Sequence, residues 1–153
     1  MTKANKAKNA VTTKKVRTCA CLNLRKAARA VTQLYDEVLA PSGLRGTQFS
    51  VLAVISAAGS ATMTDLADTL VMDRTTLTRN LKPLLDRGLV ERGEGEDRRQ
   101  RPITLTPAGR DALGQALPLW EKAQARIAGG LGAARWKGMV GDLDEAVRLA
   151  RTE

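Results

Sequence analysis

The residues best suited to chemistry lie between positions 74 and 82, where arginine, threonine and lysine recur at helical spacing. Leucines at positions 77, 81, 84 and 85 form an aliphatic stripe, and the polar residues fall on the opposite face. These polar residues are Arg74, Thr75, Thr78, Arg79 and Lys82, with Thr76 next to them. Arginine can bond guanine through two hydrogen bonds, threonine can bond a base edge or pack on a thymine methyl group, and lysine can neutralise a phosphate. The face therefore predicts a contact with duplex DNA; the alternative is the solvated side of an amphipathic helix.

A second basic group lies in a short polar loop that follows this helix. Residues 89–92 and 101–105 predict two strands of a β-hairpin, and the loop between them is too polar to be buried. The loop carries Asp97, Arg98 and Arg99, and the second predicted strand begins with Arg101. Because helix and hairpin are consecutive, both basic groups are expected on one side of a compact unit. This proximity favours a DNA contact over a merely solvated face.

Start and stop signals predict three consecutive helices between residue 47 and the hairpin. Thr47 is expected to cap the first, and Thr62 the second, where Asp65 completes an acidic capping box. Asp73 is the expected N-cap of the polar-faced helix and Gly88 its left-handed end. Helix, short helix, polar-faced helix and hairpin is the order of a winged helix-turn-helix, in which the second helix of the pair enters the major groove. The predicted fold class is mainly α with a small β-hairpin wing.

Longer helices flank this unit and carry apolar stripes that the unit cannot cover. One is predicted over residues 18–39, another starts at Thr106 and Pro107 and breaks at Gly129 and Gly130, and a last one follows. We expect the stripes to pair with those of a second copy, which gives a two-fold homodimer. The predicted organisation is a disordered basic arm over 1–17, dimerisation helices over 18–45 and 107–153, and a DNA-binding lobe over 46–106. Such a dimer fits a pseudopalindromic operator with half-sites about 10 base pairs apart.

The composition excludes several classes of protein. The chain has 153 residues, about one domain, and no histidine, which excludes Ser-His-Asp and Cys-His nucleophile systems and imidazole metal ligands. No phosphate-cradling glycine-rich loop or metal cluster is found either, so we expect neither an enzyme nor a cofactor. Aromatic residues make up 3% of the chain, too few for the stacking platforms of RNA-binding modules, which favours duplex DNA. The apolar stretches are too short for a membrane span and no signal peptide is found, so a cytoplasmic protein is expected.

The charge is strongly positive, with 25 lysines and arginines against 16 acids and a net charge of +9. Residues 1–17 hold six of these cations, no acid and hardly any large apolar side chain, which predicts the disordered arm. An alternative function is therefore a basic architectural DNA-binding protein that acts without sequence preference. That protein would bind every duplex equally, whereas a regulator should prefer one palindrome by orders of magnitude.

Three pieces of residues 62–109 have a specific pattern: LADTLVMDRTTLTR at 66–79, RGLV at 87–90, and Asp97-x-Arg99 followed by LTPAG at 105–109. Together they resemble the DNA-binding core of the MarR family of bacterial winged-helix transcriptional regulators. The resemblance implies a homodimeric, sequence-specific binder of double-stranded DNA, a repressor, released by a small and often anionic aromatic effector. It also implies that Arg99 enters the minor groove, with Asp97 orienting it. Since three acids lie at the tip, the wing is expected to contribute more to geometry than to affinity.

The two cysteines, Cys19 and Cys21, form a separate candidate site. The stretch CLNLRKAARAVTQLY at 21–35 is similar to the first helix of the organic-hydroperoxide sensors of the same family, and Cys21 falls where their reactive cysteine lies. By that similarity Tyr35 matches one of the tyrosines that bond the cysteine in those sensors. Arg25 lies where those sensors have another tyrosine. An arginine one helical turn away could still lower the pKa of a thiol. The alternative is that both cysteines are small buried hydrophobic residues.

Overall fold

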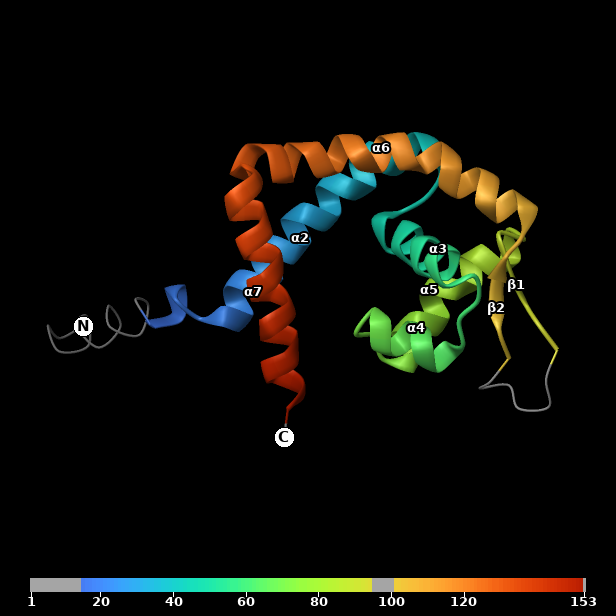
Figure 1. The fold of residues 1–153 in the computed structure, drawn as a ribbon, viewed down its shortest axis with the longest axis horizontal. Coiled ribbons are helices and arrows are strands. Elements are labelled where there is room, and N and C mark those ends of the chain that lie inside the picture. The colour runs from blue at the N-terminus through green and yellow to red at the C-terminus, as the bar shows by residue number, and fades with distance from the viewer. Residues whose placement is uncertain (1–14, 95–100, 153) are drawn as a thin grey trace, which may run out of the picture.

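The computed structural model describes residues 15–94 and 101–152 and is mainly helical, with one antiparallel hairpin (Figure 1). The elements are α2 (Ala20–Leu39), η1 (Ala40–Ser42), α3 (Gly46–Ala58), α4 (Met63–Thr69), α5 (Arg74–Asp86), β1 (Val90–Arg92), β2 (Ile103–Leu105), α6 (Pro107–Leu131) and α7 (Ala133–Arg151). The predicted fold class is confirmed. Most of the predicted arm lies outside the described residues, but residues 15–17 form a helical turn in which the Thr18 amide donates to the Lys15 carbonyl.

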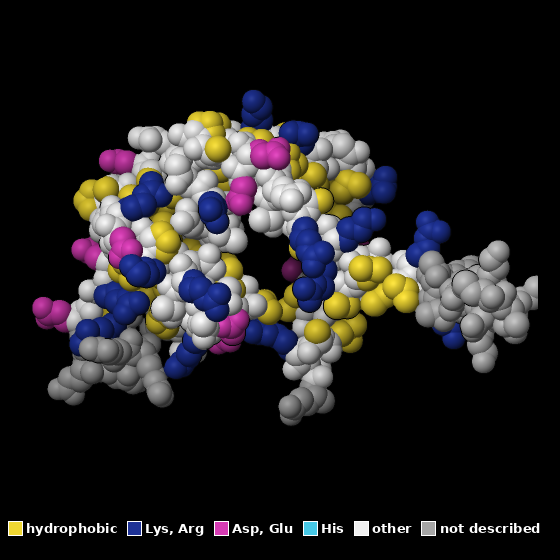
Figure 2. All heavy atoms as spheres, turned by 180° about the vertical axis from the view of Figure 1, so that it is seen from behind, with side chains coloured by type: hydrophobic (Ala, Val, Ile, Leu, Met, Phe, Trp, Pro, Cys, Tyr) yellow, Lys and Arg dark blue, Asp and Glu magenta, His cyan; other side chains and the backbone are white. Residues whose placement is uncertain are grey.

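Two groups of elements make up the fold. Helices α2 and α6 pack against each other, and α7 turns away from α6 (Figure 1). Helices α3, α4 and α5 form a lobe with the hairpin, and α3 packs against α2 and α6. The space-filling view shows an opening between this lobe and the terminal helices (Figure 2). The C-terminal end of α7 nevertheless reaches the lobe, because Arg151 Nη2 lies 3.6 Å from Asp68 Oδ1 at the end of α4.

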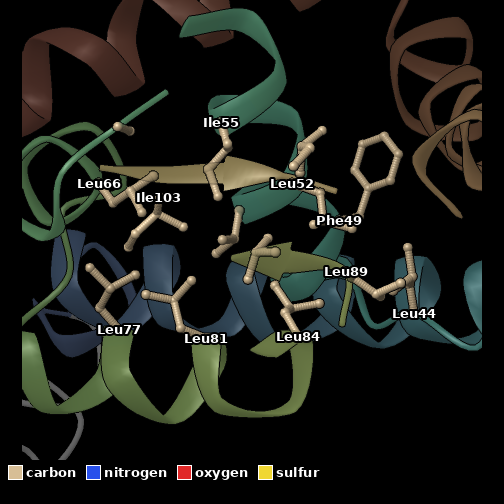
Figure 3. Packing of buried hydrophobic residues seen from close by; sticks show 14 of the residues in the cluster. Leu44, Phe49, Leu52, Ile55, Leu66, Leu77, Leu81, Leu84, Leu89 and Ile103 are labelled. Atoms are coloured by element: carbon tan, nitrogen blue, oxygen red, sulfur yellow. The ribbon is translucent and has the colours of Figure 1, made fainter. Parts of the chain in front are cut away.

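The core of the lobe is aliphatic and is built on the predicted leucine stripe of α5. Leu77, Leu81 and Leu84 are fully buried and face Leu52 of α3 and Ile103 of β2 (Figure 3). Full burial of each such side chain contributes about 1.5 to 3 kcal/mol. The opposite face of α5 is left to the solvent, as the periodicity predicted.

Three predicted helix caps are confirmed. The Thr62 side chain accepts from the Asp65 amide at 3.2 Å, and the Asp65 carboxylate accepts from the Thr62 amide at 2.9 Å. Thr106 Oγ1 accepts from the Gly109 amide at 3.0 Å, with Pro107 as the first residue of α6. Asp73 caps α5 in the same way. These caps satisfy amides that a helix cannot bond within itself.

The start of α3 was predicted wrongly. The helix begins at Gly46, one residue before the expected cap Thr47, and the Gly46 amide donates to Asp36 Oδ1 of α2 at 2.7 Å. The Arg45 amide donates to Gln48 Oε1 at 3.0 Å. A carboxylate from another helix therefore takes the place of a local capping hydroxyl, and no signal near Thr47 could have indicated it.

The end of α6 was also predicted wrongly. The helix passes through Gly129 and Gly130 and ends after Leu131, where Gly132 adopts a φ of +79°. Glycine inside a helix costs only about 1 kcal/mol relative to alanine, so two glycines weaken a long helix without ending it.

Within the described residues no single helix is long and apolar enough to cross a membrane. Helices α2 and η1 together with α3 reach the required length and hydropathy only as a joined pair, and that pair is bent by 75°.

The hairpin is short and lies close to the start of α6. Val90 pairs with Leu105 and Arg92 with Ile103, while Leu89, predicted as a strand residue, donates its amide to the Leu84 carbonyl and belongs to the turn after α5. A Cβ atom at Gly109 would lie 1.9 Å from the Leu89 carbonyl oxygen. The glycine of the LTPAG motif is therefore explained by the close approach of two backbones.

Candidate nucleic-acid interface

Helix α5 presents the predicted polar face to the solvent. Its inward leucines Leu77, Leu81 and Leu84 have no exposed surface, and this burial fixes the rotation of the helix. The side chains on the other face are all exposed, namely Arg74, Thr75, Thr78, Arg79 and Lys82. Within the described residues, Arg74, Thr75 and Thr78 have no side-chain hydrogen bond, so their donors and acceptors face water. A phosphate or a base edge can replace that water without breaking a contact inside the protein.

Thr76 differs from its neighbours because its polar groups are already used. It is half-buried, its amide donates to Asp73 Oδ1 at 2.8 Å, and its hydroxyl donates to Asp73 Oδ2 at 2.7 Å. These two hydrogen bonds, and to a smaller extent the nearby charge of Arg79, hold the pKa of Asp73 below its usual value. In this structure Thr76 thus supports the start of α5.

Lys82 lies at the far end of the same face and pairs with Asp86. Its Nζ is 2.6 Å from Asp86 Oδ2, four residues along the helix, and the two side chains are 72% and 59% exposed. An ion pair in such an environment contributes at most about 1 kcal/mol and often less. A DNA phosphate could therefore take the place of Asp86 at little cost.

The tip of the hairpin lies outside the described residues, and with it Asp97, Arg98 and Arg99. Arg101 is described and is half-buried beside the start of β2. Strand β1 packs against α5, so the hairpin and the polar helix belong to one lobe as expected. Arg92 at the end of β1 is exposed and adds a cation at a position that was predicted only as part of the strand. Figure 2 shows lysine and arginine side chains distributed over the lobe among a few acids.

The terminal helices carry most of the exposed large apolar side chains. On α7 the predicted stripe is exposed, with Val140 at 37%, Leu143 at 40% and Val147 at 40%, while Trp136 is half-buried. Leu22, Leu24 and Val31 are similarly exposed on α2, and Leu117 on α6. A single chain thus leaves apolar side chains exposed on the helices that are expected to pair with a second copy.

The cysteine site is not assembled within one chain. Cys19 and Cys21 are both free and exposed, so their interpretation as buried residues is wrong for the single chain. Tyr35 lies fourteen positions along the same helix as Cys21, about 21 Å away at 1.5 Å per residue. Its hydroxyl donates to Gln124 Oε1 of α6, and burial raises the pKa of Tyr35. Arg25 is exposed one turn from Cys21. Only a tyrosine of a second chain could reach the thiol.

Metal binding finds no support in the described part of the chain. No three carboxylate or thiol side chains gather there in an arrangement that could hold an ion. On α5 and the hairpin, the described side chains offer hydrogen bonding and charge.

Comparison with known proteins agrees with this geometry. A family model described as the MarR family matches residues 42–100. The transcriptional regulator YwoH of Bacillus subtilis is 34% identical over 83 residues, which cover 54% of this chain and 61% of YwoH. The multiple antibiotic resistance protein MarR of Salmonella typhimurium is 38% identical over 78 residues, which cover 50% of this chain and 54% of that protein. The matched part thus spans little more than half the length of these curated relatives.

Solved structures match over more of the chain. The Mycobacterium tuberculosis transcriptional regulator MosR, solved in complex with DNA, is 44% identical with a TM-score of 0.75, covering 88% of this chain and 99% of that one. A mutant MarR from Escherichia coli complexed with operator DNA is 26% identical with a TM-score of 0.69, covering 84% and 91%. In both matches the similarity includes the terminal helices as well as the lobe, because it extends over more than four fifths of the chain.

Proposed function

Because the chain belongs to the MarR family of winged-helix transcriptional regulators, we propose that it is a homodimeric repressor that binds a pseudopalindromic operator and is released by a small effector or by cysteine oxidation. The family consists of transcription regulators, and two of the similar solved structures are regulators in complex with DNA, which supports sequence-specific DNA binding by this chain. A protein of this kind would act in the cytoplasm, where the DNA is.

The observation that carries the proposal is the exposed face of α5. Two successive turns of α5 present Arg74, Thr75, Thr78 and Arg79 to the solvent, and the leucines on the other side of the helix are buried in the core. Arg79 is the best candidate for a base contact, since arginine bonds guanine through two hydrogen bonds in the major groove. Lys82 and Arg101 are candidates for phosphate contacts. Asp97, Arg98 and Arg99 stay assigned to the wing by sequence alone.

The homodimer is supported by the exposed apolar side chains of α2, α6 and α7. We expect a second copy of the chain to bury these side chains, because two-fold dimers are the commonest oligomers. Two copies would carry two α5 helices, which would reach successive major grooves on one side of the duplex, about 10 base pairs apart. The architectural alternative needs no such pairing.

The test is selection of bound sequences from random duplex DNA, followed by titration of the selected site by fluorescence anisotropy. A regulator should enrich one pseudopalindrome and bind it at least about a thousandfold more tightly than unrelated DNA. Equal binding to all duplexes would favour the architectural protein instead. The titrations need a fixed, moderate salt concentration, since non-specific affinity falls steeply with salt.

Release by oxidation is the finer part of the proposal, and the exposure of Cys21 supports it. The Cys21 thiolate would attack an organic hydroperoxide, forming a sulfur–oxygen bond as the oxygen–oxygen bond breaks; the leaving alkoxide takes a proton and departs as the alcohol. Sulfur loses two electrons and the peroxide gains them. A polar sulfenic acid would then lie among the helices expected to form the dimer, where it could displace the two α5 helices.

The discriminating variants are Cys21→Ser and Cys19→Ser. Peroxide should release the operator from the wild type and from Cys19→Ser but not from Cys21→Ser. If peroxide modifies the wild-type thiols and DNA binding persists, release belongs to a small molecule instead. In that case small anionic aromatic compounds are the class to titrate, as the family resemblance implies.

A further inference from the structure

The connection between α2 and α3 joins the terminal helices to the DNA-binding lobe, and side chains hold it from both sides. It consists of η1 and the three residues that follow, with buried Leu39 at one end and buried Leu44 near the other. Ser42 Oγ donates to the Leu39 carbonyl at 2.7 Å and accepts from the Leu44 amide at 3.3 Å. The connection is therefore an ordered turn with its own hydrogen bonds.

The first outside contact comes from Asp36 on α2. Its Oδ1 accepts a hydrogen bond from the Gly46 amide at 2.7 Å, and this amide opens α3. A carboxylate at a helix N-terminus is favourable because it meets unpaired amides and the positive end of the helix dipole. The approach is close: a Cβ atom at Gly46 would lie 3.3 Å from the Tyr35 Cβ and 3.5 Å from Asp36 Oδ1. Asp36 therefore fixes the start of α3 directly on α2.

The second outside contact comes from Arg87, the residue that follows α5. Its Nη1 donates to the Gly43 carbonyl oxygen at 2.8 Å, a contact between residues 44 positions apart. Gly43 adopts a φ of +69°, and a Cβ atom there would lie 3.6 Å from Arg87 Nη2. Arg87 is the first residue of the RGLV motif, and no DNA-contacting role was assigned to it. Its contact ties the end of the polar helix to the connection.

We propose that Asp36 and Arg87 are positioning residues that set the orientation of α5 relative to the terminal helices and thereby the half-site spacing that the dimer accepts. This inference rests on the proposed homodimer. Packing of α3 against α2 and α6 and the Arg151–Asp68 pair also join the lobe to the terminal helices. The connection itself is fixed at both ends by two hydrogen bonds to charged groups, which are stronger than neutral ones. In a two-fold dimer, any rotation of the lobe displaces both recognition helices.

The experiment measures spacing preference separately from local affinity. The selected operator is rebuilt with the half-site separation changed by one and two base pairs in each direction, each step shifting a half-site by about 3.4 Å and turning it by about 35°. Binding is followed by fluorescence anisotropy, together with a duplex that holds one half-site. The variants are Asp36→Ala and Arg87→Ala, with Asp36→Asn, which keeps the acceptor Oδ1, as the conservative partner. Glu37→Ala is the matched control, because Glu37 is exposed and adjacent to Asp36.

Wild type and Glu37→Ala should bind the selected spacing about tenfold more tightly than the neighbouring spacings. Asp36→Ala and Arg87→Ala should reduce this ratio to less than about threefold, while affinity for the single half-site changes less than about twofold, and Asp36→Asn should restore much of the preference. If an alanine variant does not fold by circular dichroism, Arg87→Met, which keeps most of the stem and removes the donors, supplies the same measurement.

Two results would overturn the inference. Either the alanine variants keep the wild-type spacing preference, or they lose affinity for all duplexes, the single half-site included, in equal proportion, as expected of a residue that only stabilises the lobe. A wild type that shows no spacing preference at all would instead contradict the proposed homodimer. The two failures are therefore distinguishable in one set of titrations.

Discussion

The Asp73 carboxylate accepts both the amide and the hydroxyl of Thr76, at 2.8 and 2.7 Å, and so closes the first turn of α5. These bonds lower the pKa of Asp73, as Thr62 lowers that of Asp65 at the start of α4. A carboxyl with a lowered folded pKa stabilises the fold above its unfolded pKa, about 3.9, and this contribution is lost as the pH falls through the folded value. Both helices of the pair therefore begin with acid-sensitive caps.

The first prediction is that Asp73→Ala lowers the unfolding temperature at pH 7 and that the difference from wild type shrinks as the pH falls below about 4. Thermal unfolding by circular dichroism at pH 7, 4 and 3 measures it. Asp86→Ala is the control, since Asp86 is an exposed acid on the same helix that caps nothing. A difference that stays constant over this pH range would contradict the role of the charged cap.

The second prediction separates base contacts from phosphate contacts on α5. Arg79→Ala should cost about 1 to 3 kcal/mol of operator affinity and relax the preference at one position in each half-site. Lys82→Ala should weaken binding to all duplexes alike and reduce the slope of log affinity against log salt by about one. Repeated sequence selection and salt titrations measure the two effects. If Arg79→Ala weakens all sequences equally, Arg79 is a phosphate contact.

The third prediction concerns the contact between α6 and the hairpin turn. Gly109→Ala should destabilise the fold by more than about 3 kcal/mol, because its Cβ would fall 1.9 Å from the Leu89 carbonyl oxygen and a backbone must move. Gly114→Ala in the same helix meets nothing within 4 Å and should stabilise by about 0.5 to 1 kcal/mol. Urea unfolding of both variants measures the effects. Similar stabilities would mean that the close approach is absent.

The fourth prediction tests the terminal helices as the dimer contact. Removing residues 133–153 deletes α7 with its exposed Val140, Leu143 and Val147 and removes its contact with α6. The truncated chain should be monomeric or should aggregate, as large uncovered apolar patches do. Sedimentation velocity over a range of concentrations measures the state. A truncated chain that remains a well-behaved dimer would place the dimer contact elsewhere.

The fifth prediction concerns residues 1–17. Because they hold six cations and no acid, their removal should lower the affinity for every duplex and flatten its salt dependence, while the selected sequence stays the same. The same anisotropy titrations measure this at several salt concentrations. A changed consensus would mean that these residues read a groove.

Local sequence was sufficient for much of the lobe. The caps at Thr62, Asp73 and Thr106 were predictable because a capping side chain bonds an amide two or three residues away. The leucine stripe predicted both the buried side of α5 and, by exclusion, its solvent-exposed polar side, since helical periodicity is a property of the segment itself. The family resemblance rested on these same residues.

Only the tertiary structure decided the contacts between distant segments. The cap of α3 comes from Asp36 on another helix, Arg87 bonds a carbonyl 44 positions away, and Gly109 is required by the backbone of Leu89. The structure also supplies the partner of Tyr35, whose hydroxyl donates to Gln124 of α6. Periodicity and capping signals describe how one segment meets water or a core, and they do not say which distant segment supplies the partner. That choice depends on how the helices pack together.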